Sequence, residues 1–493
     1  MYEKAPKKHY FFVPRRPPRS NGTERMTLNF QLDRTIRTPL TEQIQRSITK
    51  AIESGVLSPG ARLPSWVDLA AQLGVSRGTV RAAYEMLMDA QLVVASRSAG
   101  TRVSDRPAIL LKETIQPPDT GFMELYKEFT AGPAIFQLGV PAHETVPAKL
   151  FSQIRSHAMH SERRGSALYP DPRGEFELRR VIAAYLAIAR GIECLPSQII
   201  ITNGFAGGLG LALQALDLRG RSAWIEDPCF PFSRKGLELA GLKPIAIPVD
   251  SEGLDVEQAR KLESDVALAL LTPGQQAPLG MTLSLARRLS LLRWATESGG
   301  WIIEDDYLSE LQLESRAASA LASLDRDGRV IHIGSFSKTL SPTIRLGFVV
   351  APPTLAPRLS EIATCLSPAP GPAVQLATAK FIHQGHYLRH LRRAKRLYCT
   401  QRDELLKTIA NSDVRAEIST AGLAVLLKLP TGSPDLKIAR EASIFGMSPG
   451  ALSPWYSCPE RAEAALMLGI TTSSNRHLKV SCDRLSELIR RHT

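Results

Sequence analysis

The sequence predicts an α/β protein in two parts: a small N-terminal module of three helices and a hairpin, followed by a large domain built on a mostly parallel β-sheet. The length of 493 residues allows two or three domains. Helix signals come first along the chain, and from about residue 133 short apolar runs alternate with amphipathic helices. That alternation is typical of a parallel sheet covered by helices.

The composition is that of an ordinary folded protein, with 44% hydrophobic and 22% charged residues. It excludes a peptide hormone and a disulfide-rich mini-protein. No apolar run approaches the roughly 18 residues of a membrane span, and the N-terminus lacks the apolar stretch of a secretory signal. We therefore expect a cytoplasmic protein with no membrane partner. Six cysteines without a CxxC pair predict free thiols and no zinc site.

Positive charge is concentrated at the N-terminal end. Residues 1–106 hold 17 Lys and Arg against 9 Asp and Glu, so this part carries +8 of the chain's formal +13. Such asymmetry favours a polyanionic partner for the N-terminal module, most commonly nucleic acid. A basic surface that serves only solubility is the alternative interpretation.

Three helices and a hairpin are predicted within this module. An apolar residue at every fourth position predicts a helix over Thr38–Ser54. A second helix, Trp66–Gln72, ends at Gly74, and Ser76 caps a third helix. The strings LVVAS and GTRVS then flank RSAG, which predicts a small hairpin. Together these elements make a winged helix-turn-helix.

The first turns of the third helix carry Arg77, Thr79 and Arg81, where a recognition helix presents side chains to bases and phosphates. The string from PLTEQIQ to AGTRV, with its PGARLPS turn and GVSRGTV, resembles the DNA-binding domain of GntR-type bacterial regulators. The resemblance implies a double-stranded DNA operator as partner. At Trp66-Val67 the family has a polar residue followed by Arg, so we expect a phosphate or base contact to be absent there. The expected DNA contacts, from the resemblance, the helix cap and the hairpin tip, are Arg62, Ser65, Ser76, Arg77, Thr79, Arg81, Arg97, Gly100 and Thr101.

Two strand ends in the large domain carry side chains suited to chemistry. Glu304-Asp305-Asp306-Tyr307 follows an apolar run, and Gly334-Ser335-Phe336-Ser337-Lys338 follows VIHI, with Arg345 seven residues later. Ligands of such sheets bind at the carboxyl ends of the strands. A pyridoxal 5'-phosphate (PLP) site needs a lysine for the Schiff base, a carboxylate at the ring nitrogen and a phenol near the ring hydroxyl. It also needs hydroxyls and an arginine for the phosphate.

The string EDDY, followed about thirty residues later by SFSKTLSPTIRLG, resembles the fold-type I PLP enzymes. Tyr169, in YPDPRG, resembles the tyrosine that aminotransferases supply across the dimer interface to the cofactor phosphate. Gly204 and Phe205, in TNGFAGGL, occupy the place of the phosphate-binding turn at a helix N-terminus. Phe230, in IEDPCF, occupies the place of the aromatic residue that stacks on the cofactor ring.

With the N-terminal module, the chain from about Thr38 resembles the MocR/GabR-like family, in which a GntR-type domain is fused to an aminotransferase-like domain. The resemblance implies a head-to-tail homodimer with PLP on Lys338 and Asp305 at the ring nitrogen, Asp306 being the runner-up. The expected cofactor residues are Tyr169, Gly204, Phe205, Phe230, Asp305, Tyr307, Ser335, Ser337, Lys338 and Arg345. The expected division is a flexible basic arm over 1–35, a DNA-binding domain over 36–105, a linker over 106–132 and a PLP-binding domain over 133–493.

Several departures from the family pattern bear on whether the site senses or catalyses. Ala206-Gly207 stands where relatives commonly carry two glutamines, and Gly274-Gln275 replaces the usual Ser-His. Ala277 stands where aminotransferases have an asparagine to the ring hydroxyl. Thr472 falls at the place of the arginine that binds the substrate carboxylate, and a buried carboxylate without a guanidinium partner is costly. We therefore expect no ordinary transamination of α-amino acids unless Arg476 or another base substitutes.

The interpretation is a PLP-binding, DNA-binding transcriptional regulator that senses PLP or an amino compound. Two alternatives stay open: an active aminotransferase with an accessory DNA-binding module, and a regulator with a vestigial PLP site. His383, His386 and His390 would share one face of a single helix, as metal ligands can. No carboxylate or cysteine accompanies them, so we predict no metal site there.

Overall fold

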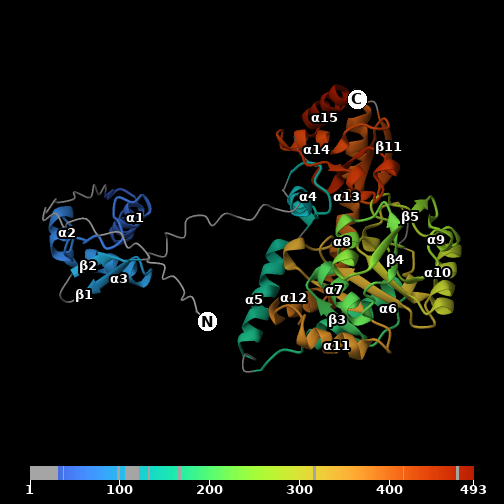
Figure 1. Ribbon diagram of the computed structural model, residues 1–493, viewed down its shortest axis with the longest axis horizontal. Helices are drawn as coiled ribbons and strands as arrows, with labels where there is room; N and C mark the ends of the chain where they lie inside the picture. The colour runs from blue at the N-terminus through green and yellow to red at the C-terminus, as the bar shows by residue number, and fades with distance from the viewer. Residues whose placement is uncertain are drawn as a thin grey trace, which may run out of the picture. The chain divides into compact units, whose positions relative to one another are not determined.

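The computed structural model of the chain describes residues 32–36, 38–96, 100–105, 121–130, 134–145, 147–164, 168–314, 318–414, 416–473 and 477–493. The chain divides into two compact units, Met1–Asp119 and Thr120–Thr493, and Figure 1 follows its course by colour. Most of the predicted basic arm, Arg97 at the hairpin tip and residues 106–120 of the predicted linker lie outside the described residues.

The small unit is a winged helix-turn-helix, as the sequence predicts. Gly74 ends the second helix in the left-handed conformation, at φ 61°, and Ser76 caps the third by accepting a hydrogen bond from the Thr79 N–H. The two hairpin strands pair antiparallel. The elements are α1 (Leu40–Glu53), α2 (Trp66–Leu73), α3 (Arg77–Asp89), β1 (Val93–Ser96) and β2 (Gly100–Val103).

The apolar face of α1 closes the core of the small unit. Ile44, Ile48 and Ile52 are fully buried and belong to the same apolar cluster as side chains of α2, α3 and the hairpin. The helix begins two residues later than predicted, because Pro39 disfavours helical backbone at Thr38. The period of four therefore predicts the buried face correctly, although it misplaces the start of the helix.

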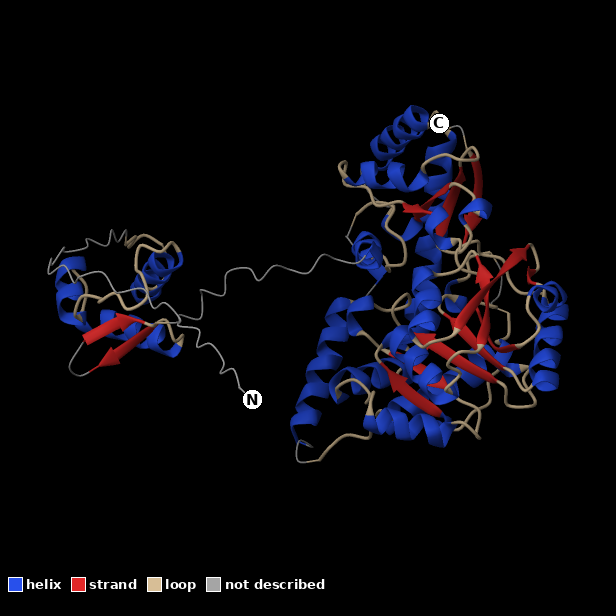
Figure 2. Ribbon diagram, in the orientation of Figure 1, coloured by secondary structure: helices blue, strands red, loops and turns tan. Residues whose placement is uncertain are grey.

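The large unit is built on an eight-stranded sheet in the order β3-β10-β9-β8-β7-β4-β5-β6. Strands β4, β5, β7, β8 and β9 run parallel, whereas β10 is antiparallel to β3 and β9, and β6 to β5. Figure 2 shows helices packed around these strands. The strands are β3 (Ile199–Thr202), β4 (Ser222–Asp227), β5 (Lys243–Asp250), β6 (Gly253–Leu254), β7 (Val266–Leu271), β8 (Trp301–Asp306), β9 (Val330–Ser335) and β10 (Gly347–Val350).

Helices cover both faces of this sheet. Ile303 of β8 packs in the apolar cluster that contains α7 and α11, whereas its neighbour Ile302 packs in the cluster that contains α10. Alternate residues of a strand face opposite sides, so one apolar run serves two cores. The helices are α5 (Ala148–Arg164), α6 (Phe176–Arg190), α7 (Gly204–Leu216), α8 (Pro231–Leu239), α9 (Val256–Leu262), α10 (Leu285–Ser298), α11 (Ala356–Cys365) and α12 (Pro372–His383).

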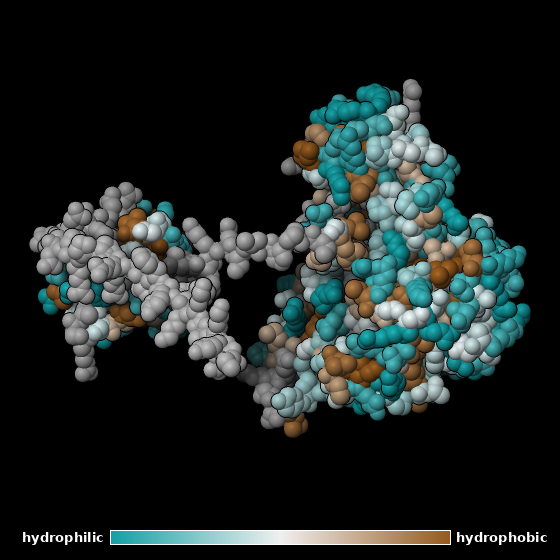
Figure 3. All heavy atoms as spheres, viewed as in Figure 1, coloured by the Kyte–Doolittle hydropathy of each residue, from teal (hydrophilic) through white to brown (hydrophobic). Residues whose placement is uncertain are grey.

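A four-stranded antiparallel sheet, in the order β11-β12-β14-β13, and two helices follow the long helix α13. Hydrophilic side chains dominate the visible surface of α14 and α15 (Figure 3). In the part of the chain that the structure describes, no helix has the length and apolar character needed to cross a bilayer. These elements are α13 (His386–Ala410), β11 (Glu417–Ala421), β12 (Ala424–Lys428), α14 (Asp435–Ser443), β13 (Gly450–Ala451), β14 (Ala465–Gly469) and α15 (Leu478–His492).

One helix lies where the sequence predicts only a linker. Helix α4 (Gly121–Thr130) carries Phe122 and Tyr126, whose rings contact Phe232 of α8 at centroid distances of 4.9 and 5.7 Å. A ten-residue helix is marginal by itself, so its stability comes from this packing. Such a tertiary contact leaves no period in the sequence.

The three histidines lie on two helices, whereas the argument from their spacing had assumed a single helix. His383 ends α12 and His386 begins α13, and Gly385 lies between them in the left-handed conformation at φ 70°. His390 is buried, and its ring nitrogens contact the carbonyl oxygens of Thr145 and Thr339. This contact gives His390 a structural role.

Candidate functional site

The predicted recognition residues lie at the start of α3. Arg77 and Arg81 are exposed and stand four residues apart, so they lie on one face of the helix. Arg81 pairs with Glu85, Nε to Oε1 at 2.9 Å, in an exposed pair of the weak i,i+4 kind. A phosphate can therefore replace Glu85 at little cost. Thr79 is half-buried, and its hydroxyl lies 2.8 Å from that of Ser76.

The turn before α2 meets the hairpin at Arg62. The Arg62 side chain is exposed and lies against Gly100, where a Cβ would be 3.4 Å from the guanidinium Nε. Thr101 is half-buried on β2. Ser65 and Ser76 are exposed, but their hydroxyls accept N–H bonds that cap α2 and α3, each at 3.1 Å. Ser65 therefore orders the start of α2, and Ser76 orders the start of α3, which carries Arg77 and Arg81.

A cavity of about 1280 Å³ opens in the large unit at the carboxyl ends of β8 and β9. Parallel sheets bind their ligands at this edge. Gly204 is the first residue of α7, beside the lining residue Phe205, whereas Tyr169 is fully exposed and does not line the cavity. The predicted cofactor residues that line it are Phe205, Phe230, Asp305, Tyr307, Ser335, Ser337, Lys338 and Arg345.

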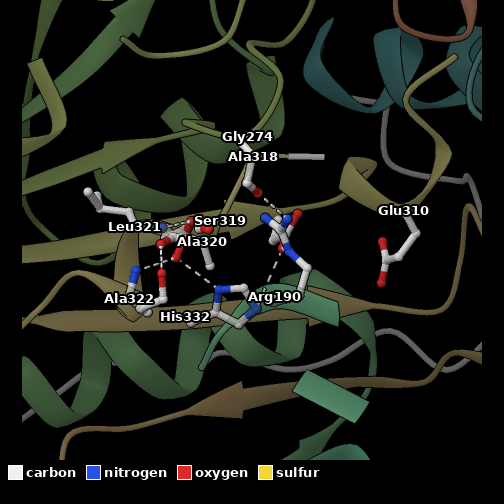
Figure 4. Close-up of polar contacts among 12 residues, drawn as sticks. Arg190, Gly274, Glu310, Ala318, Ser319, Ala320, Leu321, Ala322 and His332 are labelled. Atoms are coloured by element: carbon white, nitrogen blue, oxygen red, sulfur yellow. Dashed lines mark hydrogen bonds and ion pairs between the residues drawn. The ribbon is translucent and has the colours of Figure 1, made fainter. Parts of the chain in front are cut away.

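Strand β8 sends its carboxylates to opposite faces of the sheet. Asp305 lines the cavity, whereas the Asp306 Oδ2 lies 2.7 Å from Arg190 Nε, in a pair that is almost completely buried. Glu304 shares the face of Asp306 and lies 2.9 Å from His332 Nδ1. Figure 4 shows the polar contacts around Arg190 and His332. Asp305 is therefore the carboxylate that a ligand in the cavity can reach, and the runner-up Asp306 is engaged elsewhere.

Burial perturbs the pKa values of Asp305 and Lys338, which both line the cavity. Burial raises the pKa of Asp305 well above its usual value, the Asp306 charge adds to this, and Lys338 opposes it. Burial lowers the pKa of Lys338, which the Asp305 charge opposes, and Lys338 Nζ donates to the Gly139 carbonyl oxygen at 2.7 Å. The lowered pKa brings Lys338 closer to its neutral, nucleophilic form. A cationic ligand beside Asp305 would stabilise the ionised form of its carboxyl group.

Hydroxyl and guanidinium groups gather where α7 begins. The Ser335 and Ser337 hydroxyls lie 3.0 Å apart, and Arg345 Nη2 donates to the carbonyl oxygen of Asn203 at 3.4 Å. Asn203 precedes α7 and makes no side-chain cap, so no cap side chain occupies the first N–H groups of the helix. These N–H groups, the helix dipole and the guanidinium all favour an anion.

An aromatic cluster forms one wall of the cavity. The Phe230 ring lies 4.9 Å from Phe232 and 5.6 Å from Trp455, centroid to centroid. Phe122 and Tyr126 of α4 also line the cavity, through the same Phe232 contact. Sequence reasoning missed both residues because they lie in the predicted linker.

The departures from the family pattern lie in or near this cavity. Ala206 and Ala277 line it with methyl groups. Gln275 is buried but is not among the lining residues. The Thr472 hydroxyl donates to the Gln137 carbonyl oxygen at 3.2 Å, and is thus used within the fold. Arg476, the suggested substitute, lies outside the described residues.

Sequence reasoning also missed Gly139 and Glu226. A Cβ on Gly139 would lie 2.5 Å from Lys338 Nζ, and its φ of +71° favours glycine as well. Glu226, in β4, is only 2% exposed and borders a second, smaller cavity together with Asp305. An acid inside the apolar run AWIEDP was the signal available for Glu226, whereas Gly139 leaves no local signal.

The groups present fit PLP. One cavity combines a buried amine on Lys338, a buried carboxylate on Asp305, an aromatic wall at Phe230 and an anion site at Arg345. These are the partners that a pyridine ring with an aldehyde and a phosphate requires. Gly139 leaves open the space beside the amine that a larger residue would fill.

Comparison with known proteins gives two family matches. Residues 136–441 match the model for aminotransferase class I and II, and residues 40–103 match that for bacterial regulatory proteins of the gntR family. The probable rhizopine catabolism regulatory protein MocR of Rhizobium meliloti is 32% identical over 463 residues, which cover 90% of this chain and 93% of that protein.

Two further similarities concern a regulator and an enzyme. The HTH-type pyridoxine biosynthesis transcriptional regulator PdxR of Corynebacterium glutamicum is 31% identical over 388 residues, 78% of this chain and 81% of that protein. The crystal structure of an archaeal alanine:glyoxylate aminotransferase aligns with a TM-score of 0.70 at 25% identity, over 76% of this chain and 96% of that one.

Proposed function

Because this chain belongs to the family of MocR-type transcriptional regulators, in which a gntR-type domain precedes an aminotransferase class I and II domain, we propose that it senses PLP or an amino compound in its large cavity. The protein is a DNA-binding transcriptional regulator, and its cofactor is PLP. The observation that carries the proposal is the convergence of Lys338, Asp305 and Arg345 on one cavity, in a chain that also has a winged helix-turn-helix.

Each cavity residue has a proposed task toward PLP. Lys338 attaches the cofactor through its amine, and the Asp305 carboxylate holds the proton of the ring nitrogen. Tyr307 faces the ring hydroxyl, and Phe230 packs against the ring. Bound PLP supplies an aldehyde that reacts with amines and a ring that withdraws electrons. Ser335, Ser337, Arg345 and the start of α7 at Gly204 and Phe205 bind the phosphate.

Thr472, at the place of the carboxylate-binding arginine, favours sensing over transamination unless Arg476 or another base substitutes. An α-amino acid brings a carboxylate that needs a guanidinium when it is buried. At the position where aminotransferases place that arginine, the hydroxyl of Thr472 bonds to Gln137. We therefore propose as effector PLP itself or an amine that lacks this carboxylate.

A head-to-tail homodimer completes the proposed site. Tyr169 and its neighbour Leu168 are almost fully exposed, although Leu168 is apolar and Tyr169 carries a large aromatic ring. Leu366, directly after α11, is exposed as well. Exposed apolar surface of this kind marks interaction sites. In the dimer, Tyr169 would reach the cofactor phosphate of the other subunit.

We propose that the operator is contacted from the small unit. Arg77, Thr79 and Arg81 of α3 face the bases and phosphates, and Arg62, Gly100 and Thr101 form the backbone contact of the turn and wing. Ser65 and Ser76 act as caps as well as phosphate ligands. The proposed contact by Arg97 falls on a residue outside the described part of the chain.

An absorption measurement tests the cofactor proposal. The purified protein is mixed with PLP and passed through gel filtration, beside Lys338→Ala and the control Lys380→Ala, which removes an exposed lysine. We expect a retained visible band in the parent and the control, and none in Lys338→Ala. A blank spectrum for all three would leave the large unit as a dimerisation scaffold and refute the sensor.

A further inference from the structure

Glu226 is a buried carboxyl group that has no role among the residues proposed to bind PLP. It lies in β4, two strands away from Asp305 in β8, with β7 between them. The Glu226 Oε2 accepts two hydrogen bonds from Thr272, from the N–H at 2.9 Å and from the hydroxyl at 2.7 Å. The Oε1 atom is buried and has no partner among the described residues. An unpaired buried polar atom is costly, so Oε1 requires a ligand.

A small cavity of about 10 Å³ supplies the place for that ligand. Its wall includes Glu226, Asp305, Ser233 and Phe230. This volume is close to the room that one water molecule needs, and a buried water is stable where it meets two or more polar groups. The carboxyl groups of Glu226 and Asp305 and the Ser233 hydroxyl provide such groups.

The two carboxyl groups that border this cavity cannot both be ionised at low cost. Burial raises the pKa of Glu226 to about 7 and that of Asp305 well above its usual value. When two buried carboxyls share a site, one of them keeps its proton. A cationic ring nitrogen on the large-cavity side of Asp305 selects Asp305 as the ionised member. Cys229 also borders the small cavity, but burial raises its pKa to about 12, so its thiol stays neutral.

We propose that Glu226 is a positioning residue of the cofactor site: it keeps a proton and, through one water in the small cavity, donates a hydrogen bond that holds the Asp305 carboxylate toward the ring nitrogen. The proposal rests on the proposed function, because it presupposes PLP in the large cavity. Thr272 fixes Glu226 in turn, so the ends of β4, β7 and β8 act together.

The test compares PLP with 1-deazapyridoxal phosphate, in which a C–H group replaces the ring nitrogen. The dissociation constants of both are measured by fluorescence for the full-length parent, Glu226→Gln and Glu226→Leu. Glu226→Gln keeps an acceptor for Thr272 and a donor for the water, so we expect PLP binding within about threefold of the parent. Glu226→Leu removes both, and we expect about tenfold weaker PLP binding, as for loss of a hydrogen bond to a charged group.

The deaza analogue separates positioning from packing. Because it has no ring nitrogen for Asp305 to hold, we expect Glu226→Leu to bind it as well as the parent does, within about twofold. Equal losses for PLP and the analogue would make Glu226 a packing residue and overturn the proposal. Equal dissociation constants of Glu226→Gln and Glu226→Leu for PLP would overturn the proposal too, because the donated hydrogen bond would then not contribute to binding.

Two controls keep the result interpretable. Glu310→Leu removes another carboxyl, which lies near Arg190 in Figure 4, and should leave the ratio of the two dissociation constants unchanged. If Glu226→Leu does not fold, Thr272→Val carries the same comparison, with an expected selective loss of about threefold for PLP. If the parent binds neither compound, the proposed function itself fails.

A crystal structure of the protein with PLP bound should show one water between Glu226 and Asp305. A small cavity without water would refute the proposed water bridge.

Discussion

The ion pair behind the cofactor cavity gives the sharpest stability prediction, through the substitution Arg190→Gln. Arg190 Nε and Asp306 Oδ2 lie 2.7 Å apart, and the two side chains expose only 1% and 5% of their surface. Removing Arg190 leaves the buried Asp306 carboxylate with the more distant His332 Nε2, at 3.8 Å, and breaking a buried pair costs about 3–5 kcal/mol. We expect the free energy of unfolding of the large unit to fall by this amount at pH 7.

The double variant Arg190→Gln/Asp306→Asn separates the charge from the shape. It leaves no unpaired charge, so most of the loss should be recovered, with a residual deficit of about 1–2 kcal/mol for the changed hydrogen bonds. Arg221→Gln serves as the matched control, because the Arg221–Asp265 pair at 2.9 Å is exposed and such pairs contribute about 0–1 kcal/mol. Urea unfolding of the cofactor-free proteins, followed by tryptophan fluorescence, measures all four.

The pH dependence provides a second readout of the same pair. Burial alone would raise the pKa of Asp306, but the Arg190 charge holds it below its usual value. A lowered pKa contributes stability above the unfolded pKa of about 3.9, and this stability is lost as the pH falls through the folded value. In Arg190→Gln the carboxyl takes up a proton instead, so its deficit should shrink as the solution is acidified. A deficit below about 1 kcal/mol at pH 7, or one that grows with acidification, would refute the buried-charge argument.

Two further predictions concern the DNA surface and the cavity. Arg77→Ala and Arg81→Ala should each weaken operator binding by about 1–3 kcal/mol in fluorescence anisotropy, and unchanged affinity in both would mean that α3 does not read the operator. Gly139→Ala should lower PLP retention after gel filtration by at least about tenfold, because the new Cβ would lie 2.5 Å from Lys338 Nζ in a backbone at φ +71°. PLP retention equal to that of the parent would show that the backbone of residues 134–140 shifts to accommodate the new side chain.

The fold could be predicted where local pattern and tertiary packing agree. The period of four around Ile44 and Ile48 and the apolar runs that became β7 and β8 predict buried faces, and both are buried. Strand β10 was not predicted, because its apolar run GFVV directly follows the string SFSKTLSPTIRL with no helix between them, and so falls outside the strand–helix alternation. Helix α4 was missed because the contact of Phe122 with Phe232 stabilises it across 110 residues.

The candidate site could be predicted in composition but not in geometry. The sequence places Asp305 and Asp306 next to each other. Only the structure shows which of these alternating residues of β8 faces the cavity. Glu226 comes to the site through the order of strands β4, β7 and β8, and strand order cannot be read from local sequence.

The alternation of acids along β8 has a consequence for how this protein tolerates change. A substitution in β8 alters one side chain, but a one-residue insertion or deletion would exchange the faces of Asp305 and Asp306 together. After a deletion the cavity would receive the Asp306 carboxylate, and the Tyr307 phenol would face Arg190 in its place. We therefore expect β8 to tolerate single substitutions away from its acids better than any change in the number of its residues, and a library of single deletions should find an abrupt boundary at the ends of the strand.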